Sequence, residues 1–103
     1  METQEYQGWS NRETWATALH IDNDEGLLNP ILEVAKVHHS INDLADEIKA
    51  FIGEVLEWDN VSTNRNAYLM LIDIGSLYRV NWREIAEGYF TQTTLNQLEE
   101  ANA

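Results

Sequence analysis

The sequence predicts an all-α fold, a compact bundle of about five helices forming a single domain over residues 1–103. Three observations lead to this prediction. Capping residues recur along the chain at the spacing that opens helices. The longest periodic segment repeats its apolar residues every three to four positions. No pair of alternating segments joined by a hairpin turn is visible. We expect the two ends, residues 1–8 and 95–103, to be frayed.

The first helix is expected over residues 11–21. Ser10 lies three residues before Glu13, which is the spacing of a capping box. The acidic run at residues 22–26 is rich in turn formers and ends this helix. One side of the helix would be formed by Trp15, Ala18 and Leu19.

The second helix is expected over residues 30–37. Asn29 suits the N-cap, and Pro30 suits the first helical position, where a missing N–H costs nothing. The alternative is a start near Asp24. That start is less favourable because it would place Pro30 inside the helix.

The third helix, over residues 41–58, has the clearest periodicity in the chain. Ser40 and Asp43 have the spacing of an N-cap and its partner. At 100° per residue, one broad apolar side collects Leu44, Ala45, Ile48, Phe51, Ile52, Val55, Leu56 and Trp58. The opposite side collects five carboxylates, namely Asp43, Asp46, Glu47, Glu54 and Glu57.

The fourth helix, over residues 65–78, is apolar nearly all round, which is typical of the central and most buried helix. A short buried strand at residues 68–74 is the competing interpretation, and the Ala, Leu and Met content favours helix. Asn81 and Glu84 then cap a fifth helix over residues 82–90. A turn at residues 91–94 and a short terminal helix complete the prediction.

The four tryptophans are assigned from their places in these helices. Trp15 and Trp58 lie on apolar faces and are expected in the core, and Trp82 is expected to pack as well. Trp9 precedes the first cap, so it is either a hydrophobic staple on the first helix or an exposed interface anchor. We favour the staple.

The formal net charge of −12 restricts the class of partner. It argues against direct binding of nucleic acid or of anionic membranes, because both require clustered Lys and Arg. The absence of cysteine excludes disulfides, Fe–S clusters, cysteine-zinc sites and thiol nucleophiles. Neither a signal peptide nor a membrane-spanning apolar run is visible, so we expect a cytoplasmic protein.

No sequence pattern indicates an enzyme, a cofactor or a metal site. Known nucleophile, phosphate-loop and zinc motifs are missing. The adjacent His38 and His39 point about 100° apart on a helix and suit the solvated C-terminus of a helix better than a metal site. Asp22 to Glu33 has the length of a calcium loop, but its glycine and proline are misplaced for one.

The carboxylates of the third helix are the most distinctive feature of the sequence. They would form a ridge about 20 Å long at 1.5 Å per residue. The only basic residue of that helix, Lys49, lies well off the ridge, so mutual repulsion opposes the helix. Carboxylates in such a row can imitate the phosphates of a nucleic-acid strand and attract a basic cleft. A purely solubilising face is the simpler alternative.

Two segments carry a family resemblance. Residues 8–15 read GWSNRETW, followed by DNDEGL at 22–27, and residues 81–86 read NWREIA. The chain resembles a family of small uncharacterised proteins of bacteriophages, archaeal viruses and their hosts, with an N-G-W-[ST]-N-x-E-T-W start and a closing V-D-W-R-E-I-A. Gln7 and Asn81 depart from that pattern. The resemblance spans about residues 7–87 and implies a phage-type accessory protein in a bacterial cytoplasm, but no known activity.

Two functional hypotheses follow. The first is a non-enzymatic protein that inhibits or modulates a host protein by occupying its basic surface as a mimic of nucleic acid. Its binding residues would be Asp43, Asp46, Glu47, Glu54 and Glu57, extended by Asp22, Asp24 and Glu25. The second is a structural or adaptor bundle that self-associates through apolar surface, with a small-molecule or metal binder as a minor third. Both a monomer and a homodimer fit the sequence.

Overall fold

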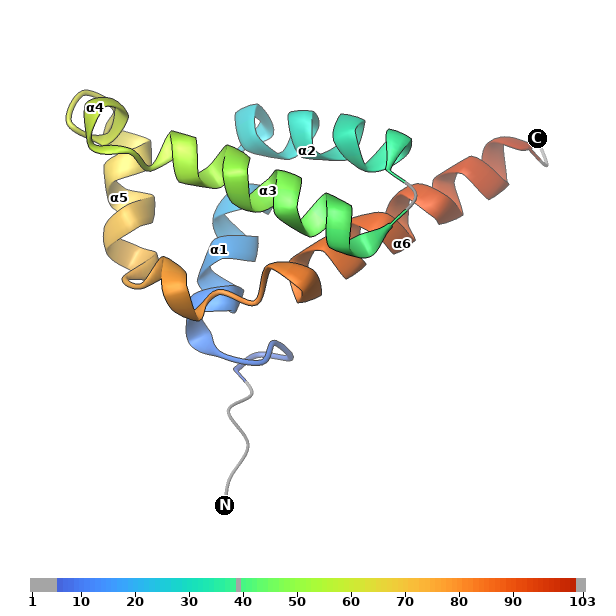
Figure 1. The fold of residues 1–103 in the computed structure, drawn as a ribbon, viewed down its shortest axis with the longest axis horizontal. Helices are drawn as coiled ribbons and strands as arrows, with labels where there is room; N and C mark the ends of the chain where they lie inside the picture. The colour runs from blue at the N-terminus through green and yellow to red at the C-terminus, as the bar shows by residue number, and fades with distance from the viewer. Residues whose placement is uncertain (1–5, 39, 102–103) are drawn as a thin grey trace, which may run out of the picture.

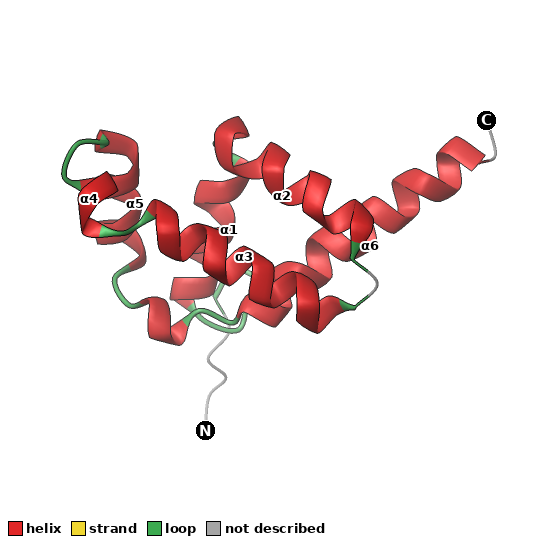
Figure 2. Cartoon of the chain, turned by 45° about the horizontal axis from the view of Figure 1, so that its top comes forward, coloured by secondary structure: helices red, strands yellow, loops and turns green. Residues whose placement is uncertain are grey.

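The computed structural model describes the backbone of residues 6–38 and 40–101, and the side chains as far as Thr91 (Figure 1). In this part the chain forms six α-helices and one 3-10 turn without any strand, which confirms the all-α prediction (Figure 2). The elements follow in the order α1 (Arg12–Asp22), α2 (Glu25–Val37), α3 (Ile41–Val55), α4 (Trp58–Val61), α5 (Arg65–Ile74), η1 (Leu77–Arg79) and α6 (Trp82–Ala101).

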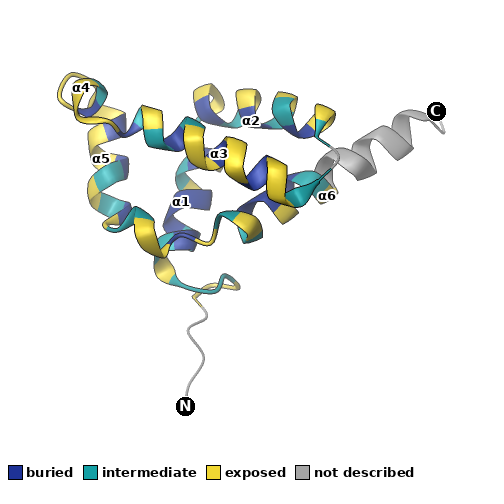
Figure 3. Ribbon diagram, in the orientation of Figure 1, coloured by how far each residue is buried: buried dark blue, intermediate teal, exposed yellow. Residues whose placement is uncertain are grey.

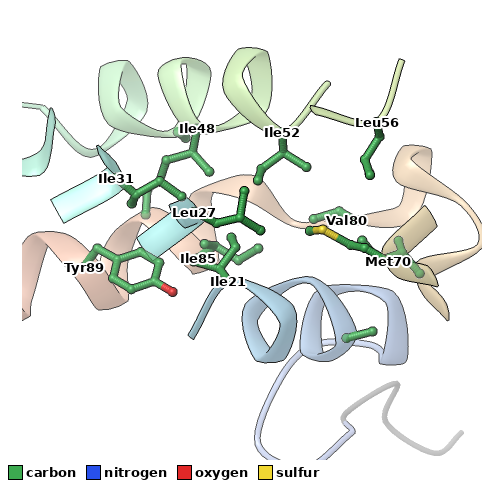
Figure 4. Close-up of a cluster of buried hydrophobic side chains, with 14 of the residues drawn as sticks. Ile21, Leu27, Ile31, Ile48, Ile52, Leu56, Met70, Val80, Ile85 and Tyr89 are labelled. Carbon is green, nitrogen blue, oxygen red and sulfur yellow. The ribbon is translucent and has the colours of Figure 1, made fainter. Parts of the chain in front are cut away.

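The hydrophobic core is built around the contact between α3 and α6, which is the most extensive in the fold. The helix α2 also packs on α6, and α1 packs on both α2 and α5. Every long helix contributes buried residues to this core (Figure 3). Ile21, Leu27, Ile52 and Ile85 come from four different helices and meet in the core (Figure 4). The C-terminal half of α6 extends away from the other helices (Figure 1).

The helix α1 begins one residue later than the capping-box spacing predicted. Its N-cap is Asn11, whose side chain accepts a hydrogen bond from the Thr14 backbone N–H. The expected cap, Ser10, is wrong, because its hydroxyl and backbone N–H both donate to Glu84 instead. Asn and Ser are equally good caps, so the choice is made by the tertiary partner available to Ser10.

The helix α2 begins at Glu25, so the predicted start at Pro30 is wrong and the alternative start near Asp24 is correct. Asp24 is the N-cap and accepts from the Gly26 backbone N–H. Pro30 lies inside the helix and forfeits the bond that an N–H there would donate to the Gly26 carbonyl. The added turn places Leu27 in the core, and burial of a leucine is worth about 1.5–3 kcal/mol, which offsets that loss.

The helix α3 has the predicted N-cap, Ser40, but ends at Val55 instead of continuing to Trp58. The side chain of Asn60 donates to the Val55 carbonyl at 2.6 Å and satisfies one of the last carbonyls of the helix. The chain then turns into the short α4, where Val61 is buried. Trp58 is 71% exposed, so its expected place in the core is wrong.

The helix α5 is peripheral, which contradicts the expectation that it is the most buried helix. It ends at Ile74 because Gly75 has a φ of +82°, so residues 75–78 do not continue it. Only one side of the helix is buried, through Ala67, Met70 and Ile74. Leu71 is partly buried against the core, whereas Tyr68, Leu69 and Ile72 face solvent, and Ile72 is 58% exposed.

The helix α6 continues without interruption from Trp82 to Ala101, so the predicted turn at residues 91–94 is wrong. That stretch contains no Gly, Pro, Asn or Asp to terminate a helix. Trp82 packs against the core as expected. Trp9 and Trp15 are partly buried against the core. The ring of Tyr6 lies against Trp15 in a tilted arrangement, with 5.0 Å between the ring centroids.

The two motif segments of the sequence lie against each other in a set of hydrogen bonds that we call the cap network. It consists of Ser10, Asn11, Thr14, Asn81 and Glu84. The Thr14 hydroxyl donates to the Asn11 side chain at 2.7 Å and accepts from the Asn81 backbone N–H at 2.8 Å. The Ser10 hydroxyl donates to the Glu84 carboxylate at 2.8 Å, and the Asn81 side chain caps α6. These motif residues therefore join the starts of α1 and α6.

Candidate partner-binding surface

The helix α3 presents its carboxylates on the side opposite the core. Asp43, Asp46, Glu47 and Glu54 are all exposed, and we call these four residues the acidic face. The opposite side of the helix is buried through Leu44, Ala45, Ile48 and Ile52. The amphipathic pattern of the sequence thus places these carboxylates together, over about 16 Å from Asp43 to Glu54 at 1.5 Å per residue.

The sequence suggested that Glu57 belongs with the carboxylates of α3, but in the structure it does not belong to the acidic face. It follows the end of α3 with an extended backbone and occupies the N-cap position of α4, where its side chain makes no capping bond. The predicted ridge of five carboxylates on one helix is therefore four on α3 and one beyond its end. The cause is the early termination of α3, which the Asn60 side chain stabilises.

The acidic face is poorly neutralised by the rest of the protein. Among the described residues its one ion pair joins Glu47 Oε1 to His38 Nε2 at 3.1 Å, and an imidazole carries charge only when protonated. The Lys and Arg ion pairs lie elsewhere, in Arg12–Asp73, Lys36–Glu33, Arg79–Glu13 and Arg83–Glu87. His39, which follows His38 in the sequence, lies outside the described residues.

The three carboxylates at the junction of α1 and α2, Asp22, Asp24 and Glu25, have different roles. Asp22 accepts a hydrogen bond of 2.6 Å from the Tyr89 hydroxyl, which ties the turn to α6. Burial and this bond raise the pKa of the Tyr89 phenol far above its usual range. Asp24 caps α2, while Glu25 is exposed and its carboxylate makes no hydrogen bond or ion pair among the described residues. Two of the three are therefore structural as well as surface residues.

A groove of about 790 Å³ opens beside this turn, between the start of α2, the end of α3 and the α4–α5 region. Its apolar lining comes from Leu27, Phe51, Val55, Ala67, Leu69 and Met70. Its polar lining includes Asn23, Asp24, Glu25, Asn60, Asn64 and Asn66. This groove is not predictable from the sequence, because its walls come from residues up to 50 positions apart and each wall alone is an ordinary helix end.

Another cluster that no sequence pattern predicted surrounds Asp73. One carboxylate oxygen lies 3.0 Å from Arg12 Nη2 and the other 2.9 Å from His20 Nε2. His20 also lines the groove. Within the part of the chain that is described, no group of three or more His, Asp or Glu side chains could hold a metal ion. Likewise, none of the described helices is long and apolar enough to span a membrane.

Fold and surface together define a small all-α protein with an acidic face on one amphipathic helix and a mixed polar and apolar groove beside it. The chain belongs to a family of unknown function, DUF7249, whose model matches residues 2–89. The match includes both halves of the cap network and the whole described core, which extends to Tyr89. No curated protein and no solved structure matches the chain.

Proposed function

We propose that this protein is a non-enzymatic binding protein that occupies a basic surface of a partner protein. The observation that carries the proposal is the acidic face of α3, four exposed carboxylates whose one ion pair in the described structure is to an imidazole. Repulsion between neighbouring carboxylates on a helix is destabilising, by about 0.2–0.5 kcal/mol per i,i+4 pair. A basic partner would relieve that repulsion and gain long-range attraction.

The spacing of the charges supports a basic nucleic-acid-binding surface as the target. Phosphates recur about every 3.4 Å along one strand of DNA. Asp43 and Glu47 are separated by about 6 Å along the axis of α3, so the face carries roughly half the linear charge density of one strand. In the phage-type setting that the motifs imply, the partner would be a host protein of the bacterial cytoplasm, and occupation of its basic cleft would inhibit it.

The experiment is capture of partners from host lysate on the immobilised protein, at low and at high ionic strength. The variant Glu47→Lys/Glu54→Lys reverses two charges of the acidic face. The matched control, Glu33→Lys/Glu87→Lys, makes the same change in net charge at two exposed positions of α2 and α6. We expect a partner that is released by high salt and by the first variant, and retained by the control. A partner that binds all three proteins equally at both salt concentrations would refute the proposal.

A second candidate function is self-association as a structural or adaptor protein, which the exposed side of α5 favours. Tyr68, Leu69 and Ile72 are 44%, 44% and 58% exposed and follow Arg65 at helical spacing, so they form one stripe. This stripe carries no carboxylate, so two copies could pack through it without bringing their acidic faces together. Light scattering tests this. A dimer that Ile72→Glu converts to a monomer supports it, and a wild-type monomer at high concentration refutes it.

A further inference from the structure

The groove beside the α1–α2 turn has the size and the lining of a binding site. Its volume of about 790 Å³ falls within the roughly 300–1,000 Å³ of typical ligand sites. Its apolar lining includes Leu27 and Met70, which also belong to the buried core cluster (Figure 4), and Phe51 of α3. Such a lining can accommodate aliphatic side-chain stems or an apolar residue.

The polar rim of the groove has unused hydrogen-bonding capacity. The side chains of Asn23 and Asn66 make no hydrogen bond within the described structure, and neither does the carboxylate of Glu25. Each asparagine amide offers one acceptor oxygen and two donor hydrogens. A peptide main chain offers the complementary pair, one N–H and one C=O per residue, so these amides suit an extended peptide.

The electrostatics of the groove favour a cation. Asp24 and Glu25 contribute two negative charges, and none of the described Lys or Arg residues lines the groove. The N-termini of α2 and α5 also line it, and each contributes roughly half a positive charge through its helix dipole. These partial charges sum to about one, which leaves the groove negative by about one charge. His20 also lines the groove, and its Nε2 atom forms a hydrogen bond of 2.9 Å with Asp73 Oδ2.

We infer that this groove binds an extended arginine- or lysine-bearing segment of the partner protein, with the main chain against the asparagine amides and the cations at Asp24 and Glu25. This inference rests on the proposed function, because it names the part of a basic partner that is recognised locally. Phe51 and Val55 line the groove from the same helix that carries Glu54 of the acidic face, so the two surfaces adjoin along α3.

The test uses a fluorescein-labelled synthetic peptide of alternating leucine and arginine, with binding measured by fluorescence anisotropy. The groove variant is Asp24→Asn/Glu25→Gln, in which asparagine keeps the N-cap of α2. The remote control Glu33→Gln/Glu87→Gln removes the same two charges elsewhere. We expect the groove variant to weaken binding about tenfold or more, which corresponds to about 1.4 kcal/mol, and the control to weaken it less than about threefold. Circular dichroism is used to check that each variant remains helical.

A second variant separates recognition from charge alone. Asn23→Ala/Asn66→Ala leaves the net charge unchanged and removes both rim amides. We expect it to weaken peptide binding several-fold, and a peptide of leucine and glutamate to bind none of the proteins. Unchanged affinity in this variant would overturn the inference that the groove grips a main chain.

The remaining outcomes distinguish this inference from the proposed function. If the groove variant and the remote control weaken binding equally, the peptide is attracted by the net charge of the protein and not by the groove, and the inference is refuted. If only Glu47→Gln/Glu54→Gln weakens binding, the peptide binds the acidic face, which supports the proposed function and refutes the groove. Absence of peptide binding also refutes the groove, whereas the proposed function is decided separately by the capture of a salt-sensitive partner.

Discussion

The hydroxyl of Thr14 holds the starts of two helices together, and its removal gives the sharpest test of the structure. Thr14 is completely buried, donates to the Asn11 side chain and accepts from the Asn81 backbone N–H. The substitution Thr14→Val keeps the shape of the side chain and removes both bonds. It leaves the Asn81 N–H without its acceptor at the start of α6.

The expected cost follows from these bonds. Loss of the acceptor leaves one donor unsatisfied, at about 1–3 kcal/mol, and loss of the bond to Asn11 costs about 0.5–1.5 kcal/mol. The added methyl group returns about 0.8 kcal/mol of burial. The free energy of unfolding should therefore fall by about 2 kcal/mol, a large share of the roughly 5–15 kcal/mol typical of domains.

A matched control is available one turn later in the same helix. Thr17 is also completely buried, but its hydroxyl donates only to the Glu13 carbonyl, four residues earlier. That carbonyl keeps its helical partner when the hydroxyl is removed, so Thr17→Val should change stability by less than about 1 kcal/mol. The comparison therefore isolates the contact between the two helix starts.

Urea unfolding followed by circular dichroism measures both variants, and hydrogen exchange reports on the Asn81 amide. We expect Thr14→Val to lower the transition midpoint with an unchanged slope, and to accelerate exchange at Asn81. Equal losses in the Thr14→Val and Thr17→Val variants would refute the reasoning. So would an Asn81 amide that is as protected in Thr14→Val as in the wild type.

Three further predictions concern stability. Burial and the hydrogen bond to Asp22 raise the pKa of Tyr89, so only the unfolded chain releases this proton near pH 10, and the free energy of unfolding should fall as the pH rises above about 10. Urea titrations of the Tyr89→Phe variant should lack this part of the fall at alkaline pH. A variant whose pH profile is identical to that of the wild type would contradict the assignment. Gly53→Ala in α3 should stabilise the protein by up to about 1 kcal/mol, because nothing lies within 4 Å of the added methyl group. Gly75→Ala should destabilise the protein by about 1 kcal/mol or more, because its φ of +82° is unfavourable for alanine. Thermal melts in which both variants shift the melting temperature in the same direction would be inconsistent with this backbone geometry. Trp58→Ser should leave the melting temperature nearly unchanged because the side chain is 71% exposed, and a large drop would show that the indole is buried.

The elements that the sequence predicted well are those controlled by local chemistry. Ser40 caps α3, Asn81 caps α6, and the apolar period of α3 marks the side that is buried. A cap bonds to a backbone N–H within three residues, and a helical face depends only on the 3.6-residue turn. The same period is enough to put Asp43, Asp46, Glu47 and Glu54 on one exposed side.

The errors arise where two local choices are nearly equal in energy and a distant contact decides between them. Ser10 and Asn11 are both good caps, but the hydroxyl of Ser10 donates a hydrogen bond to Glu84, 74 residues away in the sequence. Asn11 therefore becomes the N-cap of α1. Pro30 suits a helix start, but burial of Leu27 extends α2 past it. The apolar composition of α5 suggested a central helix, yet packing buries one side and leaves Tyr68, Leu69 and Ile72 exposed.

By itself, the sequence determined the helical class, the caps of α3 and α6 and the acidic side of α3, because these depend on interactions within about one helical turn. Only the tertiary structure decided that Glu57 leaves the acidic face, that Thr14 joins α1 to α6, and that a groove opens beside Asp24 and Glu25. Those features depend on which helix ends meet, and helix ends far apart in the chain are brought together by burial of the shared core, which no local pattern encodes.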